Sequence, residues 1–339
     1  MPNSANAKLL YEADDVLVAF AALTDQGDRQ DFRSAAALWS GRSGKAPDIK
    51  PNGVKSGGII TPEVGGTNDE VDISEVKVFI AGVETTVSAV AGQAITRPSV
   101  SNYQIFSVTV TSAGAIAVVD GAEGTSFSEV RGANGGPPWI DNDAIEIGQI
   151  RVSSQTPAPI AEDEIKQVEN VHVERYDLPN WEIEFASVEN GILGYAGIVF
   201  NSALPGIHSE DSGTTVAGKL VYAQYYTPSF VEIVDAFDFA PPSTAHSINT
   251  TQVYGRVKGS ASQTLNPGAF SVELKDGITD NLLRFANQFV WFKFYQDRLN
   301  DPYILTQGYL GAPVTFPAGA NVNATCAIAA EVDCVRVWG

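Results

Sequence analysis

The clearest alternation of hydrophobic and polar side chains in this chain lies in residues 269–310. Apolar and polar side chains alternate over residues 270–275, which is the two-residue period of a half-buried strand. Aromatic and β-branched side chains dominate residues 289–295, which favours a second strand, and residues 303–310 predict a third. Between the first two strands, apolar side chains recur at helical spacing. The pattern predicts a sheet with one short helix packed on it.

The predicted helix covers residues 279–288. Its apolar stripe is formed by Ile278, Leu282, Leu283 and Phe285, whose spacing matches one face of a helix. An amphipathic helix buries such a stripe against the neighbouring strands. A charged side chain in place of Leu282 or Phe285 is therefore expected to disrupt the fold, because the charge would be buried without a partner.

Other parts of the second half also contain short apolar segments that predict strands. Turn-forming residues separate these segments, and residues 203–218 are expected to form a long, polar, glycine-rich loop. The expected strands are residues 171–175, 181–185, 198–200, 219–226, 230–234, 322–328 and 332–337.

The first half divides into two regions of different regularity. Residues 59–157 contain short strand patterns about every ten residues, separated by turn dipeptides, which is typical of a sandwich or small barrel. Residues 1–58 are less regular and predict an N-terminal arm followed by the first strands. A Pro-containing linker is expected at residues 155–159. We therefore predict an arm at 1–58, an all-β accessory domain at 59–157 and a third domain at 161–339.

Charge excludes one large class of functions. The chain has 339 residues and a net charge of −19, of which residues 1–160 carry −8 and residues 161–339 carry −11. Such a surface repels phosphate, so we do not expect nucleic-acid binding by phosphate neutralisation. The acidity is explained by solubility alone or, alternatively, by a surface that DNA must pass without adhering.

Candidate catalytic and metal-binding residues are sparse. His172, His208 and His246 are far apart in the sequence, and no two of them have the spacing of metal ligands. Residues 141–143 with Glu146 resemble part of a calcium loop but lack its glycine and its distant glutamate, so a solvated turn is expected. No nucleotide-binding or nucleophile motif occurs. We expect no catalytic, metal-binding or cofactor-binding residues and no enzymatic activity.

The two cysteines, Cys326 and Cys334, lie close to the C-terminus. In one straight strand they would be roughly 26 Å apart, which is too far for a disulfide, although a hairpin near Ala330 would bring them together. We expect reduced, buried thiols, in keeping with assembly in a bacterial cytoplasm. Residues 3–8 are polar and do not form a signal peptide, and the longest apolar run, residues 16–23, is too short to span a bilayer.

Several segments give the chain a family resemblance. From about Glu169 to the C-terminus, the chain resembles the major tail protein of long-tailed, siphovirus-like bacteriophages, which is the tail tube subunit. The upstream half is similar to the front part of the longer members of that group. The segments that carry the resemblance are AQYYTPSFVEI at 223–233, NTTQVYG at 249–255, DGITDNLL at 276–283, FKFYQDR at 292–298 and YILTQGYLG at 303–311.

The resemblance implies a tail-tube-type β-sandwich or barrel with one short flanking helix, in addition to the N-terminal all-β domain. It implies a structural virion protein of the phage tail that assembles in the host cytoplasm into rings of six subunits, which stack into a tube. The implied partners are copies of the chain and other tail proteins at the tube ends, with no membrane. DNA would pass through without specific binding, so we expect an acidic inner wall, with Glu273 as a candidate inward-facing carboxylate.

Two other classes of function remain open. A receptor-binding or glycan-binding module of a tail fibre or baseplate would be supported by a shallow patch of exposed aromatic side chains with paired acidic residues. However, Trp181, Trp291, Tyr225 and Tyr226 lie in strand patterns that are typical of core packing. A glycoside hydrolase would need two carboxylates, and the 40 acidic residues make some such pair inevitable. Electron microscopy would show rings or tubes for the tail protein, and trimers or monomers for the other two classes.

Overall fold

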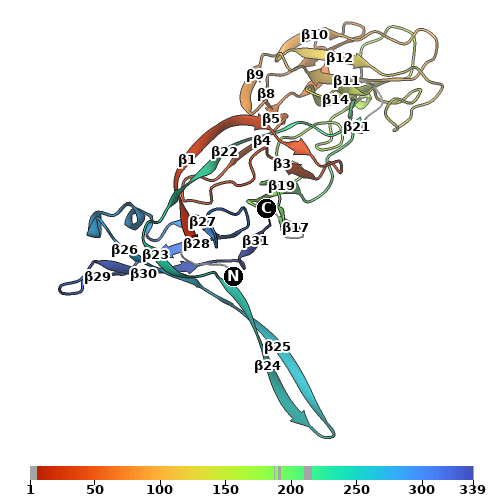
Figure 1. The fold of residues 1–339 in the computed structure, drawn as a ribbon. Coiled ribbons are helices and arrows are strands. Elements are labelled where there is room, and N and C mark those ends of the chain that lie inside the picture. Colours follow the sequence, from red (N-terminus) through yellow and green to blue (C-terminus); the bar gives the residue numbers. More distant parts are fainter. Residues whose placement is uncertain (1–5, 187, 190–191, 210–215, 339) are drawn as a thin grey trace.

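The computed structural model describes residues 6–186, 188–189, 192–209 and 216–338, and the protein is mainly β. Figure 1 shows an elongated chain with a distal β module at one end and a large sheet at the other. A smaller layer of strands lies between them, and a long hairpin projects from the large sheet. The first and last strands of the chain, β1 and β31, both belong to the large sheet, away from the distal module.

The large sheet has ten strands in the order β23-β26-β30-β28-β27-β1-β22-β4, with β29 beside β30 and β31 beside β28. Its core contains Leu9, Phe270, Phe292 and Cys326, all of them buried. The strands are β1 (Lys8–Ala22), β4 (Asp48–Pro51), β22 (Val221–Glu232), β23 (Ala236–Ala240), β26 (Gly268–Glu273), β27 (Phe289–Tyr295), β28 (Tyr303–Gly311), β29 (Val314–Thr315), β30 (Asn323–Ala329) and β31 (Val335–Val337).

The middle layer packs around Trp39, which is fully buried and stacks on Tyr225 of β22 with 5.1 Å between the ring centroids. Its sheet has the order β16-β19-β3-β2, and Phe32 and Phe200 meet edge to face in the same core. These strands are β2 (Thr24–Asp25), β3 (Asp31–Arg33), β16 (Trp181–Glu184) and β19 (Gly197–Phe200), with the pair β17 (Val188–Glu189) and β18 (Ile192–Leu193) nearby.

The distal module contains three small antiparallel sheets around one apolar core. The sheets are β10-β7-β6, β12-β11-β14-β15 and β5-β8-β9. The central strand β11 (Gln104–Val110) is buried at every position, as expected for a strand that is covered on both faces. The other strands are β5 (Gly53–Gly57), β6 (Ile60–Pro62), β7 (Glu70–Ile73), β8 (Val76–Ile80), β9 (Val83–Val87), β10 (Val90–Ala94), β12 (Ile116–Asp120), β14 (Ile145–Val152) and β15 (Ile165–Lys166).

The distal module is an excursion of the chain from the middle layer. The chain leaves after β4 and returns after β15, and a parallel pair joins β13 (Ile140–Asp141) of the module to β20 (His208–Ser209). Ile160 and Ile165 pack in the distal core beyond the linker expected at residues 155–159, next to the 3₁₀ turn η2 (Glu162–Glu164). The arm expected at residues 1–58 supplies β1 and β4 to the large sheet.

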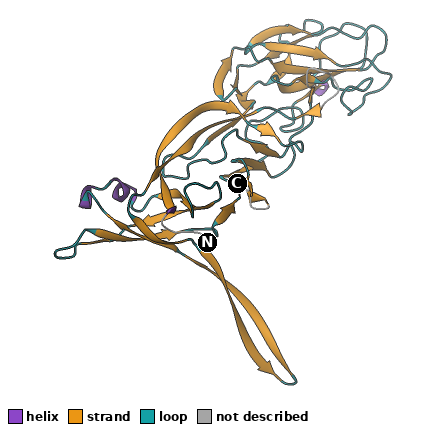
Figure 2. Cartoon of the chain, viewed as in Figure 1, coloured by secondary structure: helices purple, strands orange, loops and turns teal. Residues whose placement is uncertain are grey.

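The long hairpin consists of β24 (Ser243–Val253) and β25 (Arg256–Asn266), which extend well beyond every other part of the molecule (Figures 1 and 2). It continues from β23 through Pro241 and Pro242 and returns into β26 through Pro267. We call residues 243–266 the ribbon.

The helix predicted for residues 279–288 is wrong in type and length. The chain forms two 3₁₀ turns, η3 (Gly277–Thr279) and η4 (Asn281–Phe285), drawn in purple in Figure 2. Asp280 lies between them with ψ of 137°, an extended conformation that interrupts a helical ladder. Leu282 and Phe285 are buried as expected, but Ile278 is 70% exposed. No described helix has seven or more residues, and none is long and apolar enough to span a bilayer.

Strand predictions had mixed outcomes. Those for residues 289–295 and 303–310 are confirmed by β27 and β28, and those for 181–185 and 322–328 by β16 and β30. The two strands predicted in residues 219–234 are one strand, β22, which continues through Pro228. Residues 171–175 form turns and isolated bridges instead of a strand. Residues 210–215 of the predicted loop lie outside the described residues, as do residues 1–5.

Candidate functional site

The ribbon is regular along its whole length. β24 and β25 pair at eleven successive positions, from Ser243 opposite Asn266 to Val253 opposite Arg256, without a bulge. The two-residue turn at the tip is Tyr254-Gly255, and Gly255 has a φ of +82°, which the third position of a type II turn requires. At the base, the backbone N–H of Thr244 donates to a carboxylate oxygen of Asp333 at 3.1 Å.

Almost every side chain of the ribbon is exposed. In β24 and β25, Thr244 and Leu265 near the base are partly covered, and the other side chains are open to solvent. Ile248 is 73% exposed and Val257 is 62% exposed, while Tyr254 at the tip has no cover. An isolated two-stranded hairpin is at best marginally stable in water. The ribbon therefore leaves most of its side chains uncovered by the rest of the described chain.

The two faces of the ribbon differ in chemistry. In β25, polar side chains alternate with side chains that are mostly apolar or small, so one face is richer in aliphatic groups. On the other face, the hydroxyls of Ser247 and Ser262 lie 2.6 Å apart. The apolar face is formed by Thr244, His246, Ile248, Thr250, Gln252, Val257, Gly259, Ala261, Gln263 and Leu265. The polar face is formed by Ser243, Ala245, Ser247, Asn249, Thr251, Val253, Arg256, Lys258, Ser260, Ser262, Thr264 and Asn266.

The ribbon also differs from the rest of the chain in charge. It contains Arg256 and Lys258 and no acidic residue, giving +2, whereas the whole chain carries −19. The rest of the chain therefore carries −21. The nearest acidic residues along the sequence are Asp238 in β23 and Glu273 in β26, both outside the ribbon. The ribbon is thus a weakly basic arm on a strongly acidic protein.

Some described strands have no strand partner on one side. Among the described strands, β24 pairs only with β25, and β23 pairs only with β26. At the other end of the sheet, β4 covers β22 from Val221 to Gln224, and further along β22 the backbone N–H of Ser40 donates to the carbonyl oxygen of Tyr226 at 2.8 Å. Natural proteins usually protect edges with Pro, charged side chains or bulges, but β24 contains no Pro, Lys, Arg, Asp or Glu. This edge can pair with a strand from another chain.

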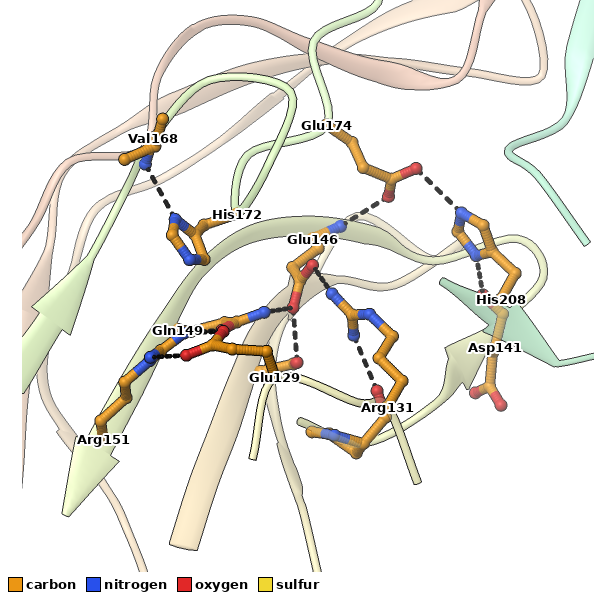
Figure 3. A network of polar contacts seen from close by, with 12 residues as sticks. Glu129, Arg131, Asp141, Glu146, Gln149, Arg151, Val168, His172, Glu174 and His208 are labelled. Atoms are coloured by element: carbon orange, nitrogen blue, oxygen red, sulfur yellow. Dashed lines mark hydrogen bonds and ion pairs between the residues drawn. The ribbon is translucent and has the colours of Figure 1, made fainter. Parts of the chain in front are cut away.

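A buried polar joint connects the distal module to the middle layer (Figure 3). His208 of β20 is fully buried, and its Nε2 lies 2.8 Å from a carboxylate oxygen of Glu174. Its Nδ1 lies 2.8 Å from the carbonyl oxygen of Asp141 in β13. The other carboxylate oxygen of Glu174 accepts the backbone N–H of Glu146 in β14 at 2.8 Å. We call Glu174, His208, Glu146, Arg131 and Lys219 the joint.

Burial and charge oppose each other in this ion pair. Burial acts to raise the pKa of Glu174, but the charge and hydrogen bond of His208 outweigh it, so the pKa of Glu174 lies below its usual value. Likewise, burial acts to lower the pKa of His208, but Glu174 outweighs it and the pKa is raised. Both shifts favour the charged pair at neutral pH. The ion pair is therefore a fixed connection between two parts of the fold.

The remaining groups of the joint are also partnered. The Glu146 carboxylate accepts the Ser107 hydroxyl at 2.5 Å and pairs with Arg131, although burial still raises the pKa of Glu146. The Lys219 ammonium donates to the carbonyl oxygen of Leu178 at 2.6 Å, and burial lowers the pKa of Lys219 to about 8. In the described part of the chain, no group of three or more His, Cys, Asp or Glu side chains could hold a metal ion. The joint is suited to holding the fold together.

The structure separates the residues that sequence analysis considered for chemistry. His172 accepts the backbone N–H of Val168 at 3.3 Å, His208 belongs to the joint, and His246 is exposed on the ribbon. Glu146, considered as part of a calcium loop, is buried and paired with Arg131. Glu174 and His208 are 34 positions apart in the sequence, and no sequence motif indicated that they pair.

Both cysteines are free thiols, as predicted. Cys326 lies in the core of the large sheet, and burial raises its pKa to about 12, so this thiol is unreactive at neutral pH. Cys334 is only partly buried, which differs from the expectation that both thiols are buried.

An open aromatic pocket lies on the large sheet. Its volume is about 530 Å³, and Phe294, Tyr303 and Trp338 are among its lining residues. The described lining includes Arg336 and Gln296 but no carboxylate. The paired acidic residues that would accompany these aromatic side chains in the expected glycan site are therefore not part of this lining.

Comparison with protein-family models, with curated proteins and with solved structures found no match to this chain. The resemblance to phage tail tube subunits therefore remains a prediction from the sequence.

Proposed function

We propose that this protein is a structural subunit that assembles with copies of itself into closed rings, which stack into the tail tube of a bacteriophage. The observation that carries the proposal is the ribbon, which exposes an unprotected strand edge and an apolar face. The number of six subunits in a ring comes from the sequence resemblance. Localisation in the virion tail, assembly in the host cytoplasm and contact with other tail proteins belong to the same proposal.

Edge pairing is the first step of the argument. In the ribbon, β24 and β25 pair only with each other among the described strands, so each has a free outer edge. Because these are two different surfaces, contacts between copies are heterologous and close into a ring if the rotation between copies allows it. If the ribbons of neighbouring copies pair side by side, they form one continuous barrel, which leaves no strand edge free.

Burial of the apolar face is the second step. Ile248 and Val257 lie on the same face and are more than 60% exposed in the single chain. A strand ribbon in a soluble assembly usually has one face packed and the other in water. Packing the apolar face on neighbouring copies removes these aliphatic groups from water, which favours assembly by about 25 cal/mol for each Å² buried.

The aromatic pocket favours a second candidate function, a receptor-binding or glycan-binding tail module. Trp338 is 62% exposed at this pocket, and aromatic faces stack on sugar rings in such modules. A module of this kind would not need the ribbon to form a barrel. The state of assembly of the purified protein therefore distinguishes the two candidates.

The test uses the full chain in light scattering and negative-stain microscopy. We expect wild-type protein to form rings or tubes, and the double variant Ile248→Ser/Val257→Ser to remain monomeric with an unchanged circular dichroism spectrum. The matched control, Asn249→Ser/Ser260→Ala, alters two neighbouring positions on the polar face and should assemble normally. A wild-type chain that stays monomeric at all concentrations and salt levels would contradict the proposal.

A further inference from the structure

We infer that the polar face of the ribbon is the surface that faces DNA in the assembled tube. This inference depends on the proposed tube assembly. It identifies the channel wall as a neutral layer of hydroxyl and amide groups, with Arg256 and Lys258 as a pair of phosphate contacts near the ribbon tip. The net charge of the whole chain favours an acidic channel wall, but this assignment gives a wall without carboxylates.

The alternation along the ribbon assigns the two faces. Side chains at positions 256, 258, 260, 262, 264 and 266 lie on one face, and all six are polar or charged. In a closed barrel that carries water, one face must be hydrated while the other packs on protein. The opposite face holds the larger share of the aliphatic side chains, Ile248, Val257, Ala261 and Leu265, whereas the polar face holds only Ala245 and Val253. Hydration therefore selects the polar face for the channel.

The position of the acidic residues supports the same assignment. The 24 residues of the ribbon include no Asp or Glu, whereas residues 53–174 contain 17 acidic and six basic residues, which gives −11. The distal module that carries this charge lies at the end of the molecule opposite the ribbon (Figure 1). Glu273, the carboxylate expected on the wall, lies in β26 beyond the ribbon, where it accepts the Asn321 amide at 2.9 Å.

Arg256 and Lys258 are two residues apart on one strand, so both extend from the polar face. In a ring, equivalent residues lie at the same height, so the pairs from all copies form one basic collar. A collar with +2 from each copy attracts the phosphates of any sequence, and this attraction weakens as salt rises. The neutral hydroxyl groups on the rest of the wall neither hold nor repel the strand strongly. DNA would therefore contact the wall mainly at the collar.

Thiol accessibility in assembled tubes tests the assignment of the faces. In a Cys334→Ser background, Ser260→Cys and Ala261→Cys place single reactive thiols on adjacent residues that are both exposed in the free chain. With a small maleimide, we expect Ser260→Cys to react at a similar rate in tubes and in dissociated subunits. Ala261→Cys should react at least about ten-fold more slowly in tubes, because its face is packed. Fast reaction at Ala261→Cys in tubes, or protection of Ser260→Cys, would overturn the inference.

Binding of a short fluorescent single-stranded oligonucleotide to assembled tubes tests the collar. We expect weak, salt-dependent binding that Arg256→Gln/Lys258→Gln reduces about ten-fold at low salt. The control Lys55→Gln/Lys275→Gln removes two exposed cations that pair with Glu84 and Asp235, and should leave binding unchanged. Equal binding by wild type and the Arg256/Lys258 variant would refute the collar. Absence of any wild-type assembly would instead refute the proposed function, so the two failures are distinguishable.

Discussion

The joint and the ribbon differ in where their side chains find partners. In the joint, His208 and Glu174 are buried and each has partners within the same chain. In the ribbon, the strands pair with each other, but Ile248 and Tyr254 are left open to solvent. One region satisfies its groups within the subunit, whereas the other leaves apolar surface and a strand edge uncovered.

This difference separates stability of the fold from capacity for assembly. A buried ion pair that loses one partner leaves an unpaired charge in a medium of low dielectric, so its loss destabilises the subunit. The ribbon covers little of the core, because its side chains lie outside the four described hydrophobic clusters. Changes in the joint should therefore affect unfolding, and changes in the ribbon should affect association.

The largest expected effect is loss of assembly on removal of the ribbon. Replacing residues 244–265 with an Asn-Gly turn keeps Ser243 next to Asn266, which is their position in the present structure. We expect no rings or tubes by electron microscopy and an unfolding midpoint within about 2 °C of wild type, since no core residue is removed. Persistent tubes, or a large fall in the unfolding midpoint, would remove the distinction between the ribbon and the rest of the fold.

The next largest effect is expected in the joint. Glu174→Ala removes one partner of His208 and should lower the free energy of unfolding by about 3–5 kcal/mol, measured by urea denaturation. The control Glu169→Ala, at an exposed position whose carboxylate lies 3.6 Å from Arg175, should change it by less than about 0.5 kcal/mol. Equal effects of the two substitutions would show that the joint does not stabilise the fold.

A smaller effect is expected in the segment that replaces the predicted helix. Leu282→Ala should cost about 2–4 kcal/mol because this side chain is 2% exposed in the core of the large sheet. Ile278→Ala, at a 70% exposed position, should cost less than about 0.5 kcal/mol. A regular helix with Ile278 in its buried stripe would instead make both substitutions costly in urea denaturation.

Local sequence patterns predicted those strands whose side-chain types by themselves favour an extended conformation. Residues 289–295 form β27 because aromatic and β-branched side chains favour a pleated, half-buried surface. The ribbon was missed because Ser, Thr, Asn and Gln dominate β24, so its alternation is weak. For the helix, apolar spacing did not reveal that Asp280 adopts an extended conformation.

Long-range pairing was outside the reach of local patterns. Leu10 of β1 pairs with Glu232, and Tyr11 pairs with Phe292, so the first strand lies in the middle of a sheet made mostly from the last third of the chain. A fragment of residues 161–339 would lack this strand and would not retain the sheet described. The joint could not be predicted from local sequence patterns either, because Glu174 and His208 are brought together by tertiary structure alone.

The smallest expected effect is the pH dependence of the joint, measured as the difference in unfolding free energy between wild type and His208→Gln. The pKa of His208 is raised above 6.5, so its contribution is complete below pH 6.5 and is lost as pH rises through the folded pKa. The pKa of Glu174 is lowered below 4.5, so its contribution is complete above pH 4.5 and is lost as pH falls through the folded pKa. The difference should therefore be largest between about pH 4.5 and 6.5.

The other charged groups near the Glu174–His208 pair are present in both wild type and His208→Gln. Their contributions therefore largely cancel in the difference in unfolding free energy between the two proteins. Arg131 opposes protonation of His208, and Lys219 adds to the charge that lowers the pKa of Glu174. A tenfold change in an acid dissociation constant corresponds to about 1.4 kcal/mol, so urea titrations at closely spaced pH values can resolve the decline. In contrast, the ribbon variant Ile248→Ser should give a difference from wild type that is independent of pH. A difference for His208→Gln that stays constant from acid to alkaline pH would mean that His208 and Glu174 do not form a charged pair.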